Sequence, residues 1–270
     1  NLYFMKTRCL LIPLISIFLF SCNLNKDESR IVKISTEKGD IIVKLYDYTP
    51  KHRDNFIKLS QDKFFDGQIF HRVIDNFVVQ GGDPKTKHSV SDTLYGNDDS
   101  GYLIDAEIID TLIHKRGALG MAREGDEINP EKKSSGSQFY LVKGKIFTDQ
   151  QLDELEKKRD LQNKSKLYKK IFNEKLLAQK SQGNIDTISI ALDMSVSFDS
   201  IWEKYPKYKF SEKQRKVYKT IGGIPHLDGN YTVFGEVIQG KEIVDEISKV
   251  QTDLNDRPVK DIKFSISVIK

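Results

Sequence analysis

Cysteine is nearly absent from this chain of 270 residues, which contains only Cys9 and Cys22. Both lie close to the start, so the rest of the sequence has no thiol that could form a disulfide framework or act as a nucleophile. A domain without cysteine suits an exported protein, because it cannot form wrong disulfides in an oxidising compartment.

The sequence also lacks a strong charge of either sign. Its 43 Lys and Arg residues nearly balance 39 Asp and Glu residues, which leaves a formal net charge of +4. Since no stripe of basic residues alternates with stacking aromatic residues, this small charge argues against a nucleic-acid partner. The chain has no His, Cys, Asp and Glu cluster with metal-ligand spacing and no phosphate loop, so we expect neither a metal nor a cofactor.

Long hydrophobic runs are missing, and the one apolar run near the start is short. Asn1–Phe4 resembles the remnant of a protease-site tag, so we expect the native chain to start at Met5. Lys6 and Arg8 then precede an apolar run from Leu10 to Phe20. This order is typical of a signal peptide, and the run is shorter than a membrane-spanning helix requires.

The end of that apolar run, Leu19-Phe20-Ser21-Cys22, resembles a bacterial lipobox. We therefore interpret residues 5–22 as a lipoprotein signal peptide and Cys22 as the lipidated residue, which would hold the protein on a membrane without spanning it. The alternatives are a plain secretory signal and a short membrane anchor. Residues 23–30 are a polar linker, or, through Lys26-Asp27-Glu28, resemble a surface-export signal of Bacteroidetes lipoproteins. The expected location is the outer membrane, on its periplasmic face or at the cell surface.

The most informative stretch of the sequence is Ile69–Asp83. Arg72, Val78 and Gln80 share one parity, so an extended chain projects all three from one face. Asp75 and Asn76 both favour turns, and a turn there can reset which face of the chain Phe77 joins. The predicted result is a cationic side chain beside an apolar floor, with an amide to orient it. Such a site suits a reaction in which no covalent bond breaks.

Short strands separated by turns make up much of the remaining sequence. Residues 31–46 are predicted to form two strands joined at Lys38-Gly39, and Thr49-Pro50 begins a helix that reaches about Leu59. Many strands with few helices favour a closed barrel, which leaves no open sheet edge. Further strands are predicted over residues 118–123, 138–142, 232–237 and 262–269, and a second helix over residues 240–247.

Residues from about 148 to 222 have a different composition, rich in Lys, Glu, Gln and Leu. Thr148-Asp149-Gln150-Gln151 and Ser211-Glu212-Lys213-Gln214 are capping-box patterns. The first begins a predicted helix that reaches about Gln182, whereas the period of residues 185–205 is ambiguous. We interpret this block as a helical insertion between two strands and its many charges as a solvated helix face.

Several long blocks of the sequence resemble cyclophilin-type peptidyl-prolyl cis-trans isomerases, in the order found in that family. They cover residues 31 to about 145 and 224–270, outside the insertion and the targeting segment. The resemblance implies one mainly β domain over residues 31–270: a closed eight-stranded antiparallel barrel, capped by two helices and interrupted by the helical insertion. The blocks are Phe70–Asp83, Gly117–Arg123 continued by Ser135–Tyr140, and His226–Val237.

The same resemblance implies roles for individual residues. Arg72 falls on the catalytic arginine of the family, and Gln80 falls on the residue that hydrogen-bonds it. Phe77, Phe139 and Leu227 fall on the walls of the proline pocket. The full set of implied substrate-binding residues is Phe77, Val78, Ala122, Arg123, Gln138, Phe139, Tyr140, His226, Leu227 and Tyr231.

Some of these positions depart from the family pattern. Val78 replaces a methionine, which shortens one wall, and Tyr140 replaces a pocket phenylalanine. Arg123 replaces an asparagine within a segment whose backbone pairs with the substrate, so the change of side chain is tolerable there. His226 stands for a tryptophan and Tyr231 for a histidine.

The implied activity is isomerisation of Xaa-Pro bonds in unfolded or proline-containing polypeptide clients, without a cofactor. Rotation about an amide bond has a barrier of about 18–20 kcal/mol, and a permanently charged arginine could lower it by donating to the twisted amide. The alternative is a proline-peptide binding module or holdase chaperone with little isomerase activity. We expect a monomer that is lipid-anchored to a membrane.

Overall fold

The computed structural model describes residues 30–90, 93–183 and 185–269. The predicted tag remnant, the signal peptide and the lipidated Cys22 lie outside the described residues, as does nearly all of the polar linker. Among the helices of the described part, none combines the length and the apolar composition that crossing a membrane would require.

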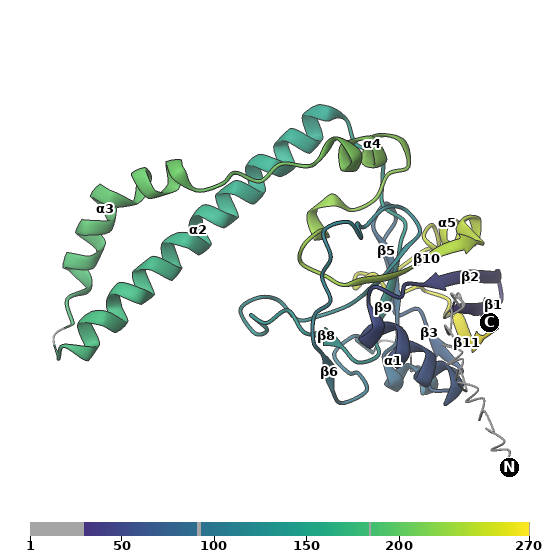
Figure 1. The fold of residues 1–270 in the computed structure, drawn as a ribbon. Coiled ribbons are helices and arrows are strands. Elements are labelled where there is room, and N and C mark those ends of the chain that lie inside the picture. The colour runs from purple at the N-terminus through teal and green to yellow at the C-terminus, as the bar shows by residue number, and fades with distance from the viewer. Residues whose placement is uncertain (1–29, 91–92, 184, 270) are drawn as a thin grey trace, which may run out of the picture.

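A curled antiparallel sheet of nine strands forms the centre of the protein (Figure 1). Its strands follow the order β3-β11-β1-β2-β10-β7-β9-β5-β4, and β6 pairs with β8 in a separate small sheet. The strands are β1 (Ile31–Thr36), β2 (Gly39–Leu45), β3 (Gln68–Ile69), β4 (Arg72–Val73), β5 (Val78–Gly81), β6 (Leu103–Ile104), β7 (Ala118–Met121), β8 (Ser134–Ser135), β9 (Phe139–Val142), β10 (Val233–Gln239) and β11 (Lys263–Val268).

The prediction of a closed eight-stranded barrel is not confirmed, because the two end strands of the sheet, β3 and β4, are not paired with each other. β3 pairs with β11 and β4 pairs with β5, but no ladder joins β3 to β4 within the described residues. These two short strands are successive parts of one segment, separated by Phe70 and His71. The chain itself therefore connects the sheet ends, and the fold is a mainly β half-barrel.

The two helices expected beside the sheet are present as α1 and α5 (Figure 1). The N-terminus of α1 is capped from a distant loop, since the carboxylate of Glu107 accepts the backbone N–H groups of Lys51 and His52 at 3.1 and 3.0 Å. Thr49 is at the N-cap position but makes no side-chain cap bond. The helices are α1 (Pro50–Gln61), α2 (Asp149–Ser181), α3 (Thr187–Lys204), α4 (Glu212–Thr220) and α5 (Lys241–Ile247), with short 3-10 helices η1 (Pro84–His88) and η2 (Pro225–Leu227).

Phenylalanine side chains form the centre of the main core. Phe56 of α1 packs with ring centroids 5.1 Å from Phe65, 5.3 Å from Phe139 and 5.3 Å from Phe234. All four rings are completely buried. Because these residues come from a helix, a loop and two strands, one aromatic cluster fixes α1 against the sheet.

Side chains of β9 alternate between two apolar clusters. Phe139 and Leu141 belong to the main core, whereas Tyr140 and Val142 belong to a second cluster on the opposite face of the sheet. This period of two follows from strand geometry. It means that the main core lies on one face of β9 and the candidate site on the other.

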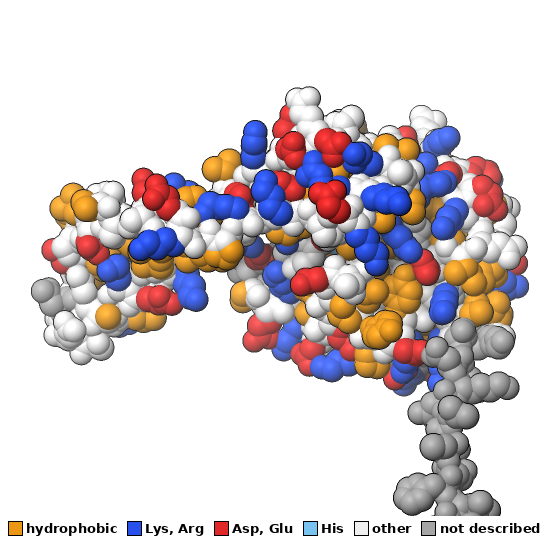
Figure 2. Space-filling model, turned by 45° about the horizontal axis from the view of Figure 1, so that its top comes forward, with side chains coloured by type: hydrophobic (Ala, Val, Ile, Leu, Met, Phe, Trp, Pro, Cys, Tyr) orange, Lys and Arg blue, Asp and Glu red, His pale blue; other side chains and the backbone are white. Residues whose placement is uncertain are grey.

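The insertion forms an arm of two packed helices, α2 and α3, that extends away from the sheet (Figure 1). The capping box predicted at Thr148 is confirmed: its Oγ1 accepts the N–H of Gln151 at 3.2 Å, and Gln151 Oε1 accepts the N–H of Thr148 at 3.0 Å. The capping box at Ser211 is also confirmed. The ambiguous residues 185–205 contain the whole of α3. Figure 2 shows basic and acidic side chains mixed along the arm, as expected of a solvated face.

The base of the insertion, unlike the outer arm, is part of the folded domain. A buried cluster contains Leu152 of α2, Tyr218 of α4 and Phe210, which precedes α4. It packs against Ile113 and Phe147. The outer arm has its own separate cluster between α2 and α3. The two ends of the insertion are therefore anchored to the sheet independently of its outer part.

Removal of the Phe56 ring tests this description of the core. We expect Phe56→Ala to lower the free energy of unfolding by about 3–5 kcal/mol, because it deletes a fully buried ring and leaves a cavity. Urea unfolding followed by circular dichroism measures the loss. Tyr48→Ala is the control, since Tyr48 is 78% exposed and should change stability little. A loss below about 1 kcal/mol for Phe56→Ala would contradict the described packing.

Candidate active site

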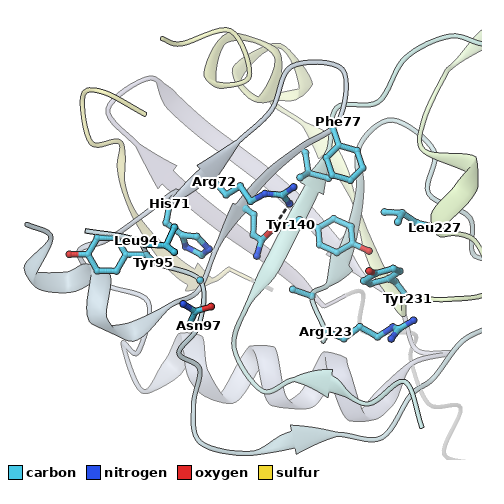
Figure 3. Close-up of a pocket in the computed structure, with 14 residues that line it drawn as sticks. His71, Arg72, Phe77, Leu94, Tyr95, Asn97, Arg123, Tyr140, Leu227 and Tyr231 are labelled. Carbon is cyan, nitrogen blue, oxygen red and sulfur yellow. Dashed lines mark hydrogen bonds between the residues drawn. The ribbon is translucent and has the colours of Figure 1, made fainter. Parts of the chain in front are cut away.

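A hollow of about 290 Å³ lies on the face of the sheet opposite the phenylalanine core (Figure 3). Its lining combines most of the predicted site residues with others that the sequence analysis did not select. The predicted residues that line it are Arg72, Phe77, Val78, Gln80, Ala122, Arg123, Tyr140, Leu227 and Tyr231. The additional residues are His71, Leu94, Tyr95, Gly96 and Asn97.

Strand register brings the central residues of this hollow into one row. Arg72 on β4 lies directly across from Gln80 on β5, and Gln80 lies across from Tyr140 on β9. Residues directly opposite in antiparallel strands project from the same face. Gly120 on β7 is opposite Tyr140, and a Cβ at Gly120 would come within 2.5 Å of the tyrosine ring. The glycine therefore makes room for the ring.

A chain of amide hydrogen bonds orients Arg72. The guanidinium donates through Nη1 to Gln80 Oε1 at 3.3 Å, and Gln80 Nε2 donates to Gln138 Oε1 at 3.0 Å. Gln138 Nε2 in turn donates to the backbone carbonyl groups of Gly96 and Asp98 at 2.9 and 2.8 Å. Since each amide uses both its donor and its acceptor, the last link fixes the orientation of the whole chain.

The Arg72 side chain remains 40% exposed while lining the hollow. Its Cζ atom lies 5.6 Å from the centroid of the Phe77 ring, and its Nε atom lies 3.8 Å from a carboxylate oxygen of Asp256. Arginine is charged at every physiological pH and presents several N–H donors in a rigid plane. A ligand in the hollow thus meets an oriented and permanently charged donor.

The turn between β4 and β5 places Phe77 beside Arg72. Asn76 has a φ of 60°, in the left-handed region that asparagine tolerates better than most residues. Its backbone N–H donates to the side chain of Asp75 at 2.8 Å, which stabilises the turn. Phe77 then packs in the same apolar cluster as Leu227. These two side chains form an apolar wall next to the charged group.

A buried polar chain extends from the Tyr140 hydroxyl to helix α4 of the insertion. The Tyr140 hydroxyl lies 2.9 Å from His114 Nε2, and His114 Nδ1 lies 2.9 Å from Asp228 Oδ1. The other carboxylate oxygen of Asp228 accepts the Tyr218 hydroxyl at 2.5 Å. Asp228 directly follows Leu227 of the apolar wall, so this chain ties the floor and the wall of the hollow to the insertion.

Burial keeps the two tyrosine hydroxyl groups of this chain protonated. Burial raises the pKa of Tyr140 well above its usual value, and burial together with Asp228 raises the pKa of Tyr218. Both hydroxyl groups therefore stay protonated at neutral pH. The carboxylate of Asp228 accepts from His114 Nδ1–H, and in that tautomer of a neutral imidazole Nε2 accepts from the Tyr140 hydroxyl.

The side chain of Arg123 is occupied by contacts within the protein. Its Nε donates to the carbonyl oxygen of Asn230 and its Nη2 to Asp126, both at 2.6 Å, and its Cζ lies 4.7 Å from the Tyr231 ring centroid. The neighbouring Ala122 uses its backbone N–H to bond Gln138 at 2.9 Å. Both residues thus border the hollow on an ordered stretch of backbone.

Three predicted residues lie elsewhere. The assignment of Phe139 to the pocket wall is corrected: its ring belongs to the main core, because alternate residues of β9 face opposite sides and Tyr140 takes the wall position. Gln138 is buried behind the hollow, where it orients Gln80. His226 stacks on Phe77, with ring centroids 5.9 Å apart and an interplanar angle of 8°, and borders a different hollow.

The residues that sequence reasoning missed come mainly from the loop after η1. Leu94, Tyr95 and Asn97 line the side of the hollow next to His71 (Figure 3). This loop has no apolar period that could have indicated its position. The His71 ring is buried, with no hydrogen-bond partner for either nitrogen in the described part of the chain. Burial and the charge of Arg72 lower the pKa of His71 to about 4.

The lowered pKa of His71 predicts a pH dependence of stability. The unfolded chain binds a proton at His71 below its usual pKa of about 6.5, whereas the folded chain does so only near pH 4, so stability falls as pH falls between these values. We expect urea unfolding to show a smaller loss between pH 7 and 4.5 for His71→Gln than for the unchanged protein. His88→Gln, at an exposed site, should keep the original slope. Equal slopes for all three proteins would contradict the prediction.

Comparison with known protein families agrees with this geometry. The family model described as "Cyclophilin type peptidyl-prolyl cis-trans isomerase/CLD" matches residues 31–164 and 214–268. The gap between these two ranges coincides with the outer arm of the insertion. The start of α2 and most of α4 fall inside the match, in keeping with their packing against the sheet.

Individual relatives match across nearly the whole chain. A Staphylococcus saprophyticus protein named "Putative peptidyl-prolyl cis-trans isomerase" is 28% identical over 249 residues, which cover 92% of this chain and 95% of that protein. A Staphylococcus aureus protein of the same name is 27% identical over 244 residues, covering 88% and 92% of the two chains.

Solved structures show the same fold. The crystal structure of a Cryptosporidium parvum cyclophilin type peptidyl-prolyl cis-trans isomerase has a TM-score of 0.51 at 21% identity, covering 90% of this chain and 98% of that one. A second structure of that protein, in the presence of the dipeptide Ala-Pro, has a TM-score of 0.50. Because the family model matches well over half of its length, this chain belongs to the cyclophilin-type peptidyl-prolyl cis-trans isomerases.

Proposed function

We propose that this isomerase acts on Xaa-Pro bonds of exported or surface polypeptides and assists their folding by stabilising the twisted amide without covalent chemistry. The observation that carries the proposal is the placement of Arg72, oriented by Gln80 beside an apolar hollow. This arrangement supplies one oriented cation and an apolar surface for the proline ring, and the proposed reaction needs no other group.

The required stabilisation can be judged from the uncatalysed reaction. Prolyl isomerisation takes tens to hundreds of seconds at 25 °C because the amide C–N bond has partial double-bond character. Shortening about 30 s to about 1 ms requires roughly 6 kcal/mol of preferential binding to the transition state. In that state the nitrogen lone pair is localised, so the Arg72 guanidinium can donate either to the nitrogen or to the carbonyl oxygen.

The proline ring is proposed to occupy the apolar part of the hollow. Phe77, Val78 and Leu227 supply aliphatic and aromatic surface there, and Tyr140 forms the floor. The hollow of about 290 Å³ is large enough for a residue pair such as the Ala-Pro dipeptide supplied to the Cryptosporidium parvum relative. Holding the ring while the preceding residue rotates would confine the motion to one bond.

Pairing of the client backbone is proposed for Arg123. The N–H of Ala122 is already bonded to Gln138, and the carbonyl oxygen of Ala122 accepts the N–H of Ser135 at 2.8 Å. The next residue along the chain, Arg123, also lines the hollow, and its guanidinium is already bonded to Asn230 and Asp126, which leaves its backbone for a client. An extended client would pair there as an added strand.

The setting of the activity is proposed from the first residues of the sequence. The lipobox-like Cys22 and the absence of cysteine from the rest of the chain support an exported, lipid-anchored protein at the outer membrane. Its clients would be unfolded or proline-containing chains near that membrane, met by a monomeric enzyme. Mass spectrometry of the lipid-modified peptide from its natural host would test the anchor.

Replacement of Arg72 tests the proposed mechanism. We expect Arg72→Ala to lower kcat/KM for a Xaa-Pro tetrapeptide by about 10²–10³-fold, because it removes a donor that acts in the transition state. Arg72→Lys is the matched variant, which keeps the charge but not the planar fork and should recover only part of the rate. Protease-coupled absorbance or exchange spectroscopy measures the rates. Retention of more than half of the activity by Arg72→Ala would refute the assigned role.

A second function, binding of unfolded chains by the arm, is favoured by one observation on α3. Ile188, Leu192 and Val196 are spaced four residues apart and are all strongly exposed, so they form an apolar stripe on the helix surface. Exposed apolar stripes of this kind mark interaction surfaces. The protein would then combine isomerisation at the hollow with holdase activity along the arm.

Removal of the outer arm separates these two functions. Because Leu152 and Tyr218 belong to the folded base, the replaced segment should be limited to residues 164–205, exchanged for a short Gly-Ser linker. We expect tetrapeptide isomerisation to change by less than about twofold, since the hollow is untouched, and refolding of a proline-limited protein client to slow by more than that. Equal effects on both substrates would contradict a client-binding role of the arm.

A further inference from the structure

A second hollow lies between helix α2 and the turn η2, next to the proposed proline site. Its volume is about 190 Å³, and it shares no lining residue with the first hollow. It exists only because the base of the insertion packs beside the sheet. Its lining residues are Leu155, Lys158, Arg159, Gln162, Phe210, Pro225, His226 and Asn230.

Residues that are neighbours in the sequence line the two hollows. His226 and Asn230 line the second hollow, whereas the residues that follow them, Leu227 and Tyr231, line the first. The His226 ring stacks on Phe77, which faces the proline site, with 5.9 Å between ring centroids. An extended chain advances about 3.3 Å per residue, so a client with its proline in the first hollow reaches the second within roughly two to four residues.

The second hollow has an apolar part, here called its floor, and a basic part, here called its rim. Leu155, Phe210 and Pro225 supply apolar surface, and burial lowers the pKa of His226, which keeps that ring neutral. Lys158 and Arg159 lie at the rim.

Further basic groups adjoin this rim. A third hollow, which shares Arg159 with the second, also includes Lys132 and Lys166. The acidic group among them, Asp126, is already bonded to Lys166 and Arg123 at 2.6 Å each. The rim therefore has an excess of positive charge.

Arg159 has an unused donor at this position. Its guanidinium stacks on Tyr208, with Cζ 3.9 Å from the ring centroid, and its Nη1 atom is buried without a hydrogen-bond partner among the described residues. No carboxylate among the described residues pairs with this guanidinium, so an acidic side chain that enters the hollow would supply its missing counter-charge.

We propose that the second hollow is a subsite for the client polypeptide, which takes an apolar side chain on its floor and an aspartate or glutamate at Arg159, roughly two to four residues from the proline. This inference rests on the proposed function, since it assumes that the client's proline occupies the first hollow. It gives the base of the insertion a direct part in client selection.

Paired peptides test the proposal. Each peptide carries the same Xaa-Pro core and an extension of four residues that contains Leu. The extension is on the N-terminal side of the core in one series and on the C-terminal side in the other. Within a pair, the two peptides differ only in having Glu or Gln at the second, third or fourth residue from the proline. Fluorescence anisotropy gives Kd, and exchange spectroscopy gives the isomerisation rate. In one of the two series we expect the Glu peptide to bind about tenfold more tightly than its Gln partner.

Two variants show whether Arg159 causes this preference. Arg159→Gln should reduce the Glu-over-Gln ratio to about one, whereas Lys157→Gln, which removes the same charge from an exposed site on α2, should keep it. An unextended tetrapeptide should be isomerised at the same rate by all three proteins, which also confirms that each is folded.

The outcomes separate the two proposals. Equal binding of Glu and Gln peptides in both series, or a preference that survives Arg159→Gln, would overturn the subsite. Failure of the unchanged protein to isomerise the tetrapeptide would instead contradict the proposed function, and the Kd values would still decide whether an acidic residue is bound at Arg159.

Discussion

The register of four neighbouring strands is the constraint on which the proposed site depends. Arg72, Gln80, Tyr140 and Gly120 lie directly opposite one another across β4, β5, β9 and β7. A slip of one residue in any of these pairings would turn a charged or polar side chain toward the phenylalanine core. The core on one face, with Phe139 and Leu141 fully buried, therefore fixes the row on the other face. The packing of the core and the alignment of the proposed site therefore depend on the same hydrogen bonds between strands.

The insertion is joined to this row through polar contacts as well as packing. Tyr218 on α4 bonds Asp228, and Asp228 bonds His114, which bonds the floor residue Tyr140. All four residues are buried, and breaking such a chain would leave an unpaired polar group in the interior. The base of the insertion thus supports the floor of the hollow, whereas the apolar cluster of the outer arm is formed between α2 and α3. This division explains why the family match stops within α2 and resumes in α4.

Sequence reasoning identified the family, most of the strands and much of the site lining, because these depend on local patterns. The alternation around Val78 and Gln80 and the capping boxes at Thr148 and Ser211 are signals that lie within a few residues. What it missed depends on distant contacts. The capping of α1 by Glu107 and the lining supplied by Tyr95 connect segments far apart in the chain, and no local pattern indicates them. Phe139 was misplaced because its role came from the family resemblance, without the alternation of side chains along β9. The closed barrel was not confirmed because β3 and β4 are parts of one segment.

The central claim is that Gln80 acts on the reaction only by orienting Arg72. A double-mutant cycle tests it most directly, with kcat/KM for a Xaa-Pro tetrapeptide measured for Gln80→Met, Arg72→Ala and the double variant. The account predicts that Gln80→Met slows the reaction about tenfold when Arg72 is present and has almost no effect when Arg72 is absent. An equal loss from Gln80→Met in both backgrounds would show that Gln80 acts independently, and the account would be contradicted.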